Sequence, residues 1–153
     1  MAALAAHQGT TIFDLDWRPT LWDRAAEYGA LAREAAEHAD IVIGNEEEVA
    51  AAAGEPRVLL ELGVRTLVLK RGERGALLFD DGQEVDVPGH PVEVVNGLGA
   101  GDAFVATFVQ SLHADLPVEE AVRRGSVAGA IVAAQLACSE AMPTLQELEA
   151  EIA

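Results

Sequence analysis

A glycine-rich turn between an apolar run and a long apolar helix pattern constrains this chain most. It extends from Val94 to Phe104 and reads VVNGLGAGDAF. Glycines at 97, 99 and 101 allow a tight turn and a close approach of the backbone to a ligand. The helix that follows presents unpaired N–H groups and the positive end of its dipole, which together favour an anion. We therefore expect an anion-binding turn after a β run.

One carboxylate, Asp102, ends the turn. An acid beside an anion site repels the anion unless it has a chemical role, and a fitting role is to take a proton from an attacking hydroxyl. The alternative is that Asp102 caps the helix, which acids commonly do. Spacing alone leaves both interpretations open, and the two roles are compatible.

The charge of the chain limits its partners. Its 153 residues include 26 acids against 10 Lys and Arg, a formal net charge of −16. Nucleic acid and anionic membrane surfaces are not expected as partners, because phosphate binding needs clustered cations. The single cysteine, Cys138, excludes an internal disulfide and fits a reducing cytoplasm. We find no signal-peptide pattern in residues 1–8 and no apolar run of membrane length, so we predict a cytoplasmic protein.

The order of the periodic segments predicts an α/β fold with a mostly parallel sheet and a single domain over residues 1–153. A helix is expected to end within Ala2–His7. Strands are expected at Thr10–Asp16, Asp40–Gly44, Thr66–Lys70, Ala76–Phe79 and Glu84–Val87, and helices at Leu21–His38, 46–53, Pro56–Leu62, Ala103–Leu112, Pro117–Leu136 and after Thr144. Asp81-Gly82 predicts a hairpin turn.

Polar residues follow two of these strands. The segment 14–19 reads DLDWRP, and its Arg18 is suited to a carboxylate or phosphate, although a polar loop before a helix explains it too. Asn45 and Glu48 lie three residues apart, share a helix face and could reach a hydrated Mg²⁺. A helix N-cap by Asn45 with acids in the first turn explains the same residues.

The densest positive cluster comprises Lys70, Arg71 and Arg74, in the segment KRGERG at 70–75. It would suit nucleotide phosphates, and a solvated hairpin explains it equally well. Further along, Arg123 and Arg124 are expected in solvent.

Several of these motifs resemble those of the ribokinase-like (PfkB) carbohydrate kinases, in the same order. The GAGD at 99–102 after a β run is similar to the family signature, the NEEE at 45–48 to its N-x-x-E motif, and the KRGERG at 70–75 to its nucleotide-binding strand and turn. Within the family, DLDWRP resembles the D-x-D/N-x-R-P element of sugar-acid kinases. The CSEAMPT at 138–144 is similar to a segment of the kinases of inositol breakdown. The resemblance covers nearly the whole chain.

The resemblance implies the C-terminal half of a ribokinase-like (Rossmann-like) three-layer sandwich and ATP-dependent phosphorylation of a primary hydroxyl on a sugar acid. It implies that Asp102 is the base and that Asn45 and Glu48 position Mg²⁺ and its water. The charge on the transferred phosphoryl group would be held by backbone N–H groups of Gly99, Ala100 and Gly101.

Further ligands are implied by the same resemblance. They are Lys70, Gly72, Gly75 and Ser126 for the nucleotide, and Arg18 and Asp16 for the substrate. Ser126 stands where many members of the family have an asparagine near adenine.

The chain also departs from the family pattern. Asn96-Gly97 stands where the common motif has Asp-Thr, so a neutral amide replaces a carboxylate of the family's monovalent-cation site. The chain begins where the second half of the catalytic domain would begin, so we expect most sugar contacts and a small β lid to be absent. The strand near Ile12 would then have an exposed edge, which favours a homo-oligomer or association with a partner.

Three functions remain in competition. The chain is a sugar-acid kinase, a nucleotide-binding half-domain that is inactive alone, or an interaction piece that needs a complementary chain to fold. ATP binding without phosphoryl transfer would favour the second. A monomer that melts cooperatively at every concentration would count against the third. Another specificity, such as 2-keto-3-deoxygluconate, is the enzymatic alternative.

Overall fold

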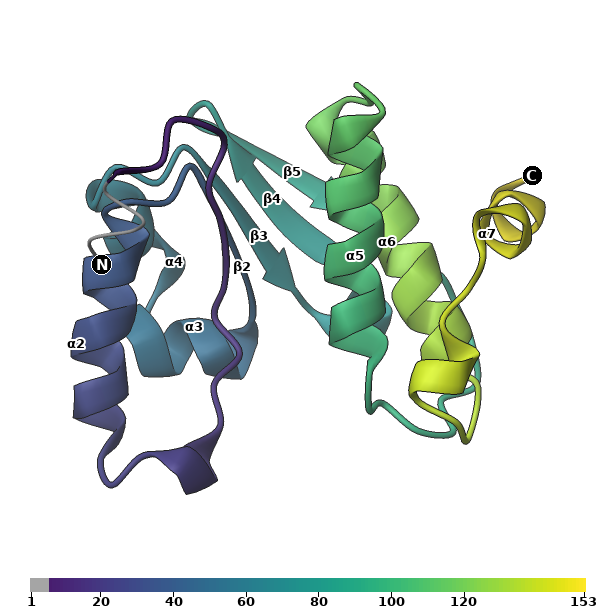
Figure 1. Cartoon of the computed structure of the whole chain (residues 1–153), viewed down its shortest axis with the longest axis horizontal. Helices are drawn as coiled ribbons and strands as arrows, with labels where there is room; N and C mark the ends of the chain where they lie inside the picture. Colours follow the sequence, from purple (N-terminus) through teal and green to yellow (C-terminus); the bar gives the residue numbers. More distant parts are fainter. Residues whose placement is uncertain (1–5) are drawn as a thin grey trace. The chain divides into compact units, whose positions relative to one another are not determined.

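The computed structural model describes residues 6–153, and within them the elements follow the predicted order (Figure 1). The strands are β1 (Ile12–Asp14), β2 (Ile41–Asn45), β3 (Thr66–Lys70), β4 (Ala76–Asp80) and β5 (Gln83–Val87). The α-helices are α2 (Ala25–Ala36), α3 (Glu46–Ala53), α4 (Pro56–Glu61), α5 (Ala100–His113), α6 (Val118–Ala133) and α7 (Leu145–Ile152). Short 3₁₀ turns occupy Pro19–Leu21, Gly72–Arg74 and Ser139–Ala141. Residues 2–5 of the expected N-terminal helix lie outside the described residues.

The strands form one sheet in the order β1-β2-β3-β4-β5. β1 pairs with β2 in parallel, with Phe13 opposite Val42, and β2 pairs with β3 in parallel, with Val42 opposite Leu67. At the hairpin between β4 and β5, Asp81 and Gly82 both have positive φ, 46° and 78°. Two positive φ angles in a two-residue loop are what a type I′ turn requires. The predicted α/β class, the parallel strands and the hairpin are confirmed.

The chain divides into two compact units. The first comprises Met1–Arg71 with Leu77–Val85, and the second comprises Gly72–Ala76 with Asp86–Ala153. That residues 1–153 form one partial kinase domain stays a prediction.

Helices α2, α3 and α4 build the core of the first unit with the parallel strands. The fully buried residues there include Val49, Leu59 and Leu67. Helix α2 starts later than predicted, because Pro19–Leu21 forms a 3₁₀ turn that leaves Leu21 76% exposed. Its buried face consists of Tyr28, Gly29, Ala32, Ala35 and Ala36, so small side chains set the close approach of the helix.

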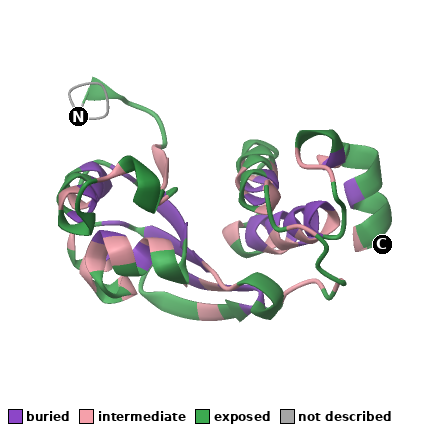
Figure 2. Ribbon diagram, turned by 90° about the horizontal axis from the view of Figure 1, so that it is seen from below, coloured by how far each residue is buried: buried purple, intermediate pink, exposed green. Residues whose placement is uncertain are grey.

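The second unit is built around the α5–α6 pair. Phe104 and Phe108 of α5 are buried, and their rings are stacked 6.4 Å apart. The two helices approach closely, because a Cβ on Gly125 would lie 3.0 Å from the Phe104 carbonyl oxygen. Buried positions, purple in Figure 2, alternate with exposed ones along the helices, so each helix has one buried face.

The solvent position expected for Arg124 is wrong. Its side chain is buried and pairs with Glu149 of α7, and its Nη1 lies 3.9 Å from Glu120. Helix α7 packs on α6 and supplies this acid, which local periodicity does not reveal. The hydrogen bond from Arg124 is the main cause that lowers the pKa of the Glu149 carboxyl.

Candidate active site

Three residues at strand ends of the first unit lie on one face of the sheet. Asp14 ends β1, Asn45 ends β2 and Lys70 ends β3. Asn45 is the Cα partner of Lys70, and Asp14 is the partner of Ile43, which lies two residues before Asn45. Residues two apart in a strand share a face, so all three side chains leave the sheet on the same side. In parallel sheets this carboxyl edge is where ligands gather.

Asn45 and Glu48 form a complete capping box at the start of α3. The Asn45 Oδ1 accepts a hydrogen bond from the Glu48 N–H at 2.9 Å, and the Glu48 Oε2 accepts one from the Asn45 N–H at 2.6 Å. The capping interpretation is therefore confirmed. The cap uses one oxygen of each side chain, so it is compatible with metal binding by the other Glu48 oxygen.

Lys70 lies between two acids of the same unit. Its Nζ is 3.4 Å from Asp14 Oδ1 and 3.8 Å from Glu48 Oε2. The side chains of Lys70 and Glu48 are only 14% and 12% exposed, and that of Asp14 is 30% exposed. Water therefore screens these charges less than it screens an open surface pair.

Arg18 and Asp16 pair with each other just beyond β1. Arg18 donates from Nε to Asp16 Oδ1 at 2.8 Å, and both side chains are more than half exposed. Asp16 has a φ of 40°, in a region that aspartate adopts more readily than most residues. The pair is accessible to a substrate, and an exposed pair of this kind contributes little to folding.

Tyr28 lies next to this acidic edge. Its hydroxyl donates to the Leu15 carbonyl at 2.9 Å, and its ring contacts those of Trp17 and Trp22. Burial is the main cause that raises the pKa of Tyr28 to about 12, and the nearby carboxylates act in the same direction, Glu48 most among them. A neutral hydroxyl is thereby kept beside the acids.

Absorbance titration is expected to report this shift directly, because Tyr28 is the single tyrosine of the chain. The folded protein should titrate near pH 12, and the protein in urea near the ordinary value of 10.0. The unfolded chain then releases the proton first, so stability should fall as the pH rises from 10 toward 12. The Tyr28→Phe variant should lack this component, and a folded midpoint near 10 would contradict the assignment.

The glycine turn of the second unit differs from its prediction in two respects. The β run before it is not a strand, since residues 91–97 are irregular and Val94 and Val95 are about half exposed. Within the described residues, no strand packs against these two valines, so burial in a sheet does not explain their apolar character. Instead, the N–H groups of Val95 and Asn96 both donate to the Ala133 carbonyl at the end of α6, at 2.8 and 3.0 Å.

The N-cap of α5 is Gly99, with a left-handed φ of 86°. Asp102 is therefore the third residue of the helix, so the interpretation of Asp102 as the N-cap residue is wrong. Gly99 has no side chain, and no side-chain cap hydrogen bond forms there. The Ala100 N–H donates to the Gly97 carbonyl at 3.3 Å, so the following N–H groups of the first turn are the ones that remain for an anion. Asp102 and Gly101 are exposed beside them, and Ala100 is half-buried.

Other residues hold the turn from the sides. Asn96 accepts a hydrogen bond from the Leu98 N–H at 3.1 Å and donates one to the Leu136 carbonyl at 3.0 Å. A Cβ on Gly99 would lie 2.5 Å from the Cys138 Sγ and 3.4 Å from the Met142 Cε. The CSEAMPT segment thus packs directly on the glycine motif.

The remaining predicted nucleotide ligands also lie in the second unit. Gly72 begins the 3₁₀ turn and Gly75 follows it, with φ of 59° and 81°. Ser126 lies on α6, and its hydroxyl donates a hydrogen bond to the Val122 carbonyl at 3.1 Å.

Residues 6–153 contain no cluster of three or more His, Cys, Asp or Glu arranged to hold a metal ion. No helix among them is long and apolar enough to cross a membrane.

Comparison with known proteins decides the family. The model of the pfkB family carbohydrate kinases matches residues 1–145. The chain belongs to the pfkB family of carbohydrate kinases. The predicted resemblance is confirmed, and so is the ribokinase-like fold.

This pfkB-family chain is similar to named enzymes over about half of their length. It is 32% identical to a 5-dehydro-2-deoxygluconokinase of Geobacillus kaustophilus, over 94% of this chain and 46% of that protein. It superposes on a fructokinase from Vibrio cholerae bound to fructose, ADP and calcium with a TM-score of 0.89 and 26% identity, over 99% of this chain and 54% of that one. A ribokinase II from E. coli in complex with ATP and Mg²⁺ gives a TM-score of 0.83 and 27% identity, over 94% and 48%.

Sequence reasoning about this pfkB-family chain missed two features of the site. Periodicity assigns Tyr28 only to a helix stripe, and Asp14 belongs to a motif that gives it no role of its own. Asp14 could have been identified by assuming that the carboxyl ends of the parallel strands lie side by side. That assumption places it near Lys70, the single lysine of the chain.

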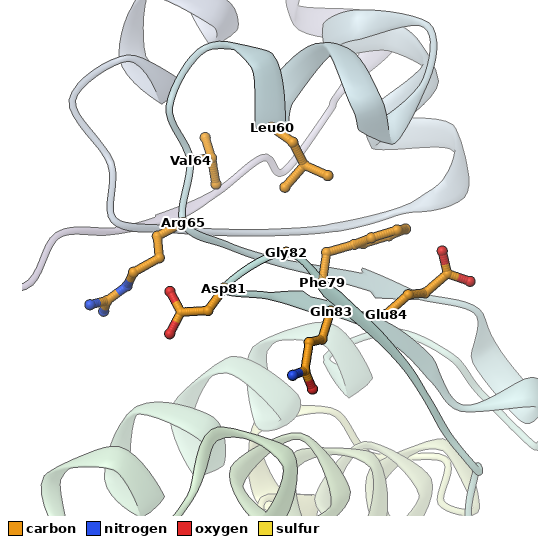
Figure 3. Close-up of a pocket in the computed structure, with 8 residues that line it drawn as sticks. All are labelled: Leu60, Val64, Arg65, Phe79, Asp81, Gly82, Gln83 and Glu84. Carbon is orange, nitrogen blue, oxygen red and sulfur yellow. The ribbon is translucent and has the colours of Figure 1, made fainter.

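One hollow of the first unit lies away from every predicted residue. It has a volume of about 360 Å³ and is formed by the end of α4 and the β4–β5 hairpin (Figure 3). In the close-up, Leu60, Val64 and Phe79 form its apolar wall, whereas Arg65 and Asp81 lie at its side. No residue of the pfkB motifs lines this hollow.

Proposed function

We propose that this chain carries the nucleotide-binding and phosphoryl-transfer part of an ATP-dependent sugar-acid kinase, with 5-dehydro-2-deoxy-D-gluconate of inositol breakdown as the substrate. The observation that carries the proposal is the exposed Asp102 in the first turn of an α5 helix whose N-terminus no side chain caps. Membership of the pfkB family and 32% identity to a 5-dehydro-2-deoxygluconokinase support the reaction class and the substrate.

In the proposed reaction Asp102 acts as general base. It takes the proton of a primary hydroxyl, whose oxygen forms a bond to the γ-phosphorus of ATP while the bond to the β–γ bridging oxygen breaks and ADP leaves. The negative charge on the transferred group is met by backbone N–H groups of Gly99 and Gly101, and by that of Ala100 once it leaves the Gly97 carbonyl. Such transfer depends mostly on positioning and charge neutralisation, which a rigid backbone turn supplies.

Asn45 and Glu48 fit Mg²⁺ as donors. Mg²⁺ is held in proteins by one or two carboxylates together with phosphates and water, so a single Glu48 oxygen and an amide are a sufficient protein contribution. When bound, the ion would neutralise charge on the phosphates of ATP. The complex of the E. coli ribokinase II with ATP and Mg²⁺ supports the use of Mg²⁺ together with ATP.

The other predicted ligands are proposed with their roles unchanged, apart from Lys70. Gly72 and Gly75 would line the nucleotide pocket, with Ser126 near adenine. The exposed Arg18, oriented by Asp16, would contact the carboxylate of the sugar acid, because guanidinium binds carboxylates in a forked geometry. A cytoplasmic location is proposed with the same reaction.

A nucleotide-binding half-domain that is inactive alone is the second candidate. The chain spans about half the length of the curated relatives it matches, and this observation favours it. Strand β1 is three residues long and ends the sheet order, so we also propose association through its edge. A monomer in sedimentation at all concentrations would contradict that association.

Calorimetry and phosphorus NMR test the proposal together. We expect the purified chain to bind ATP with Mg²⁺ and, given 5-dehydro-2-deoxy-D-gluconate, to form a sugar phosphate monoester and ADP. ATP binding without a phosphate ester on any sugar acid would favour the half-domain. The absence of ATP binding would overturn both candidates.

A further inference from the structure

The position of the single lysine is unusual for this composition. The sequence has 26 acids and one lysine, and that lysine lies at the end of a central strand with its side chain 14% exposed. Lysine is seldom buried unless it is paired. Here it is paired twice, with Asp14 at 3.4 Å and with Glu48 at 3.8 Å.

These two pairs join three parts of the first unit. Asp14 lies at the end of β1, Lys70 at the end of β3, and Glu48 in the first turn of α3. The same Glu48 oxygen, Oε2, also accepts the Asn45 N–H at 2.6 Å. One carboxylate oxygen is thus fixed by a backbone donor and by the ammonium group, and the other oxygen is fixed in consequence.

We propose that Lys70 and Asp14 are positioning residues that orient Glu48 toward a divalent cation, and that Lys70 is not a phosphate ligand. The inference rests on the proposed function, in which Glu48 binds the metal. It replaces the role first expected for Lys70 as a nucleotide ligand. The ammonium group lies between two carboxylates, so drawing it toward a phosphate would lengthen both pairs and weaken the counter-charge on two acids.

The direction in which cation affinity changes when Lys70 is removed distinguishes a positioning role from a simple charge effect. Lys70 contributes one positive charge beside two negative ones, so its removal makes the edge more negative. If charge alone mattered, a cation would then bind more tightly. If Lys70 orients the ligand, the cation should bind more weakly, because partners that orient a metal ligand change metal affinity by about 10- to 100-fold.

The test measures Mn²⁺ affinity and ATP affinity separately by calorimetry, ATP in the presence of EDTA. For Lys70→Met we expect an Mn²⁺ dissociation constant about tenfold higher, with metal-free ATP affinity unchanged. Lys70→Arg should restore the metal affinity. Arg57→Met is the matched control, because it also removes one positive charge, from an exposed pair with Glu61. It should leave both affinities unchanged.

A second variant covers the case in which Lys70→Met does not fold. Asp14→Asn leaves the Lys70–Glu48 pair in place and removes its anchor on β1, so it should weaken Mn²⁺ binding in the same direction by a smaller factor. Reductive methylation with ¹³C-formaldehyde gives an independent readout in the wild type. The single lysine yields one side-chain resonance, which bound Mn²⁺ should broaden.

Each other outcome overturns the inference or its basis. Tighter Mn²⁺ binding by Lys70→Met, or loss of ATP binding with Mn²⁺ affinity unchanged, would reject the positioning role. A wild type that binds ATP but no Mn²⁺ would reject it too, while leaving the role of Asp102 intact. A wild type that binds neither would instead reject the proposed function itself.

Discussion

The Asp102→Asn variant is expected to lose phosphoryl transfer by about 100- to 10,000-fold, the usual contribution of a general base. Asparagine has the same shape but cannot accept the proton of the sugar hydroxyl. The side chain is exposed in the first turn of α5, so the fold should remain. ATP affinity should stay equal or rise, because a negative charge beside the phosphates is removed. Ester formation by phosphorus NMR and ATP binding by calorimetry check the two parts.

A matched acid in another helix provides the control. Glu119 is also exposed in a helical first turn, that of α6. Glu119→Gln removes the same charge from an equivalent dipole environment and should leave turnover unchanged. Full turnover in Asp102→Asn, or an equal loss in both variants, would rule out a base at position 102.

The second large effect is expected from Gly75→Ala, on folding. Gly75 has a φ of 81°, and a Cβ there would lie closer than 3.0 Å to the backbone of both Val87 and Gly89. The left-handed conformation costs about 1–2 kcal/mol for a residue with a side chain. Overpacking costs about 1–3 kcal/mol more, since backbone atoms cannot rotate away. We expect a loss of about 3 kcal/mol in the free energy of unfolding, measured by urea denaturation.

Gly82→Ala separates the two causes. Gly82 has nearly the same φ, 78°, in the type I′ turn, and a Cβ at this position would meet no atom within 4 Å. It should therefore show only the conformational part, about 1–2 kcal/mol. Equal losses at the two positions would mean that the close crossing of the chain at Gly75 and Gly89 contributes nothing.

Local sequence rules predicted those parts of the fold that local contacts determine. The N-cap at Asn45 and the helix start after Thr144 were predicted, and both form with a complete capping box, closed by Glu48 and Glu147. The Asp81-Gly82 hairpin depends on the φ angles of two residues. The buried strands β2 and β3 are short apolar runs, and parallel sheets bury such runs on both faces.

The same rules failed where a distant segment decides the outcome. Val94 and Val95 have high strand propensity, but no strand within residues 6–153 pairs with them, and the Val95 N–H donates to the Ala133 carbonyl at the end of α6. Arg124 is buried because α7 supplies Glu149, which lies 25 residues further along. Periodicity within one helix carries no information about either partner.

The candidate site was predictable in its residues more than in its contacts. Family motifs and strand ends indicate Asn45, Glu48 and Asp102 without any geometry. The contact of Lys70 with Asp14 joins residues 56 positions apart and depends on the register of three strands. Spacing also could not assign the helix cap to Gly99, because the first helical residue, Ala100, is defined only in the folded structure.

Because Gly99 contacts Cys138, the residues tolerated at these two positions should depend on each other. A methyl carbon at position 99 would lie only 2.5 Å from the sulfur of residue 138. A library that varies position 99 alone should therefore return glycine. One that also admits glycine or alanine at 138 removes this steric barrier, and any alanine then recovered at 99 would come only from clones with a shortened residue 138.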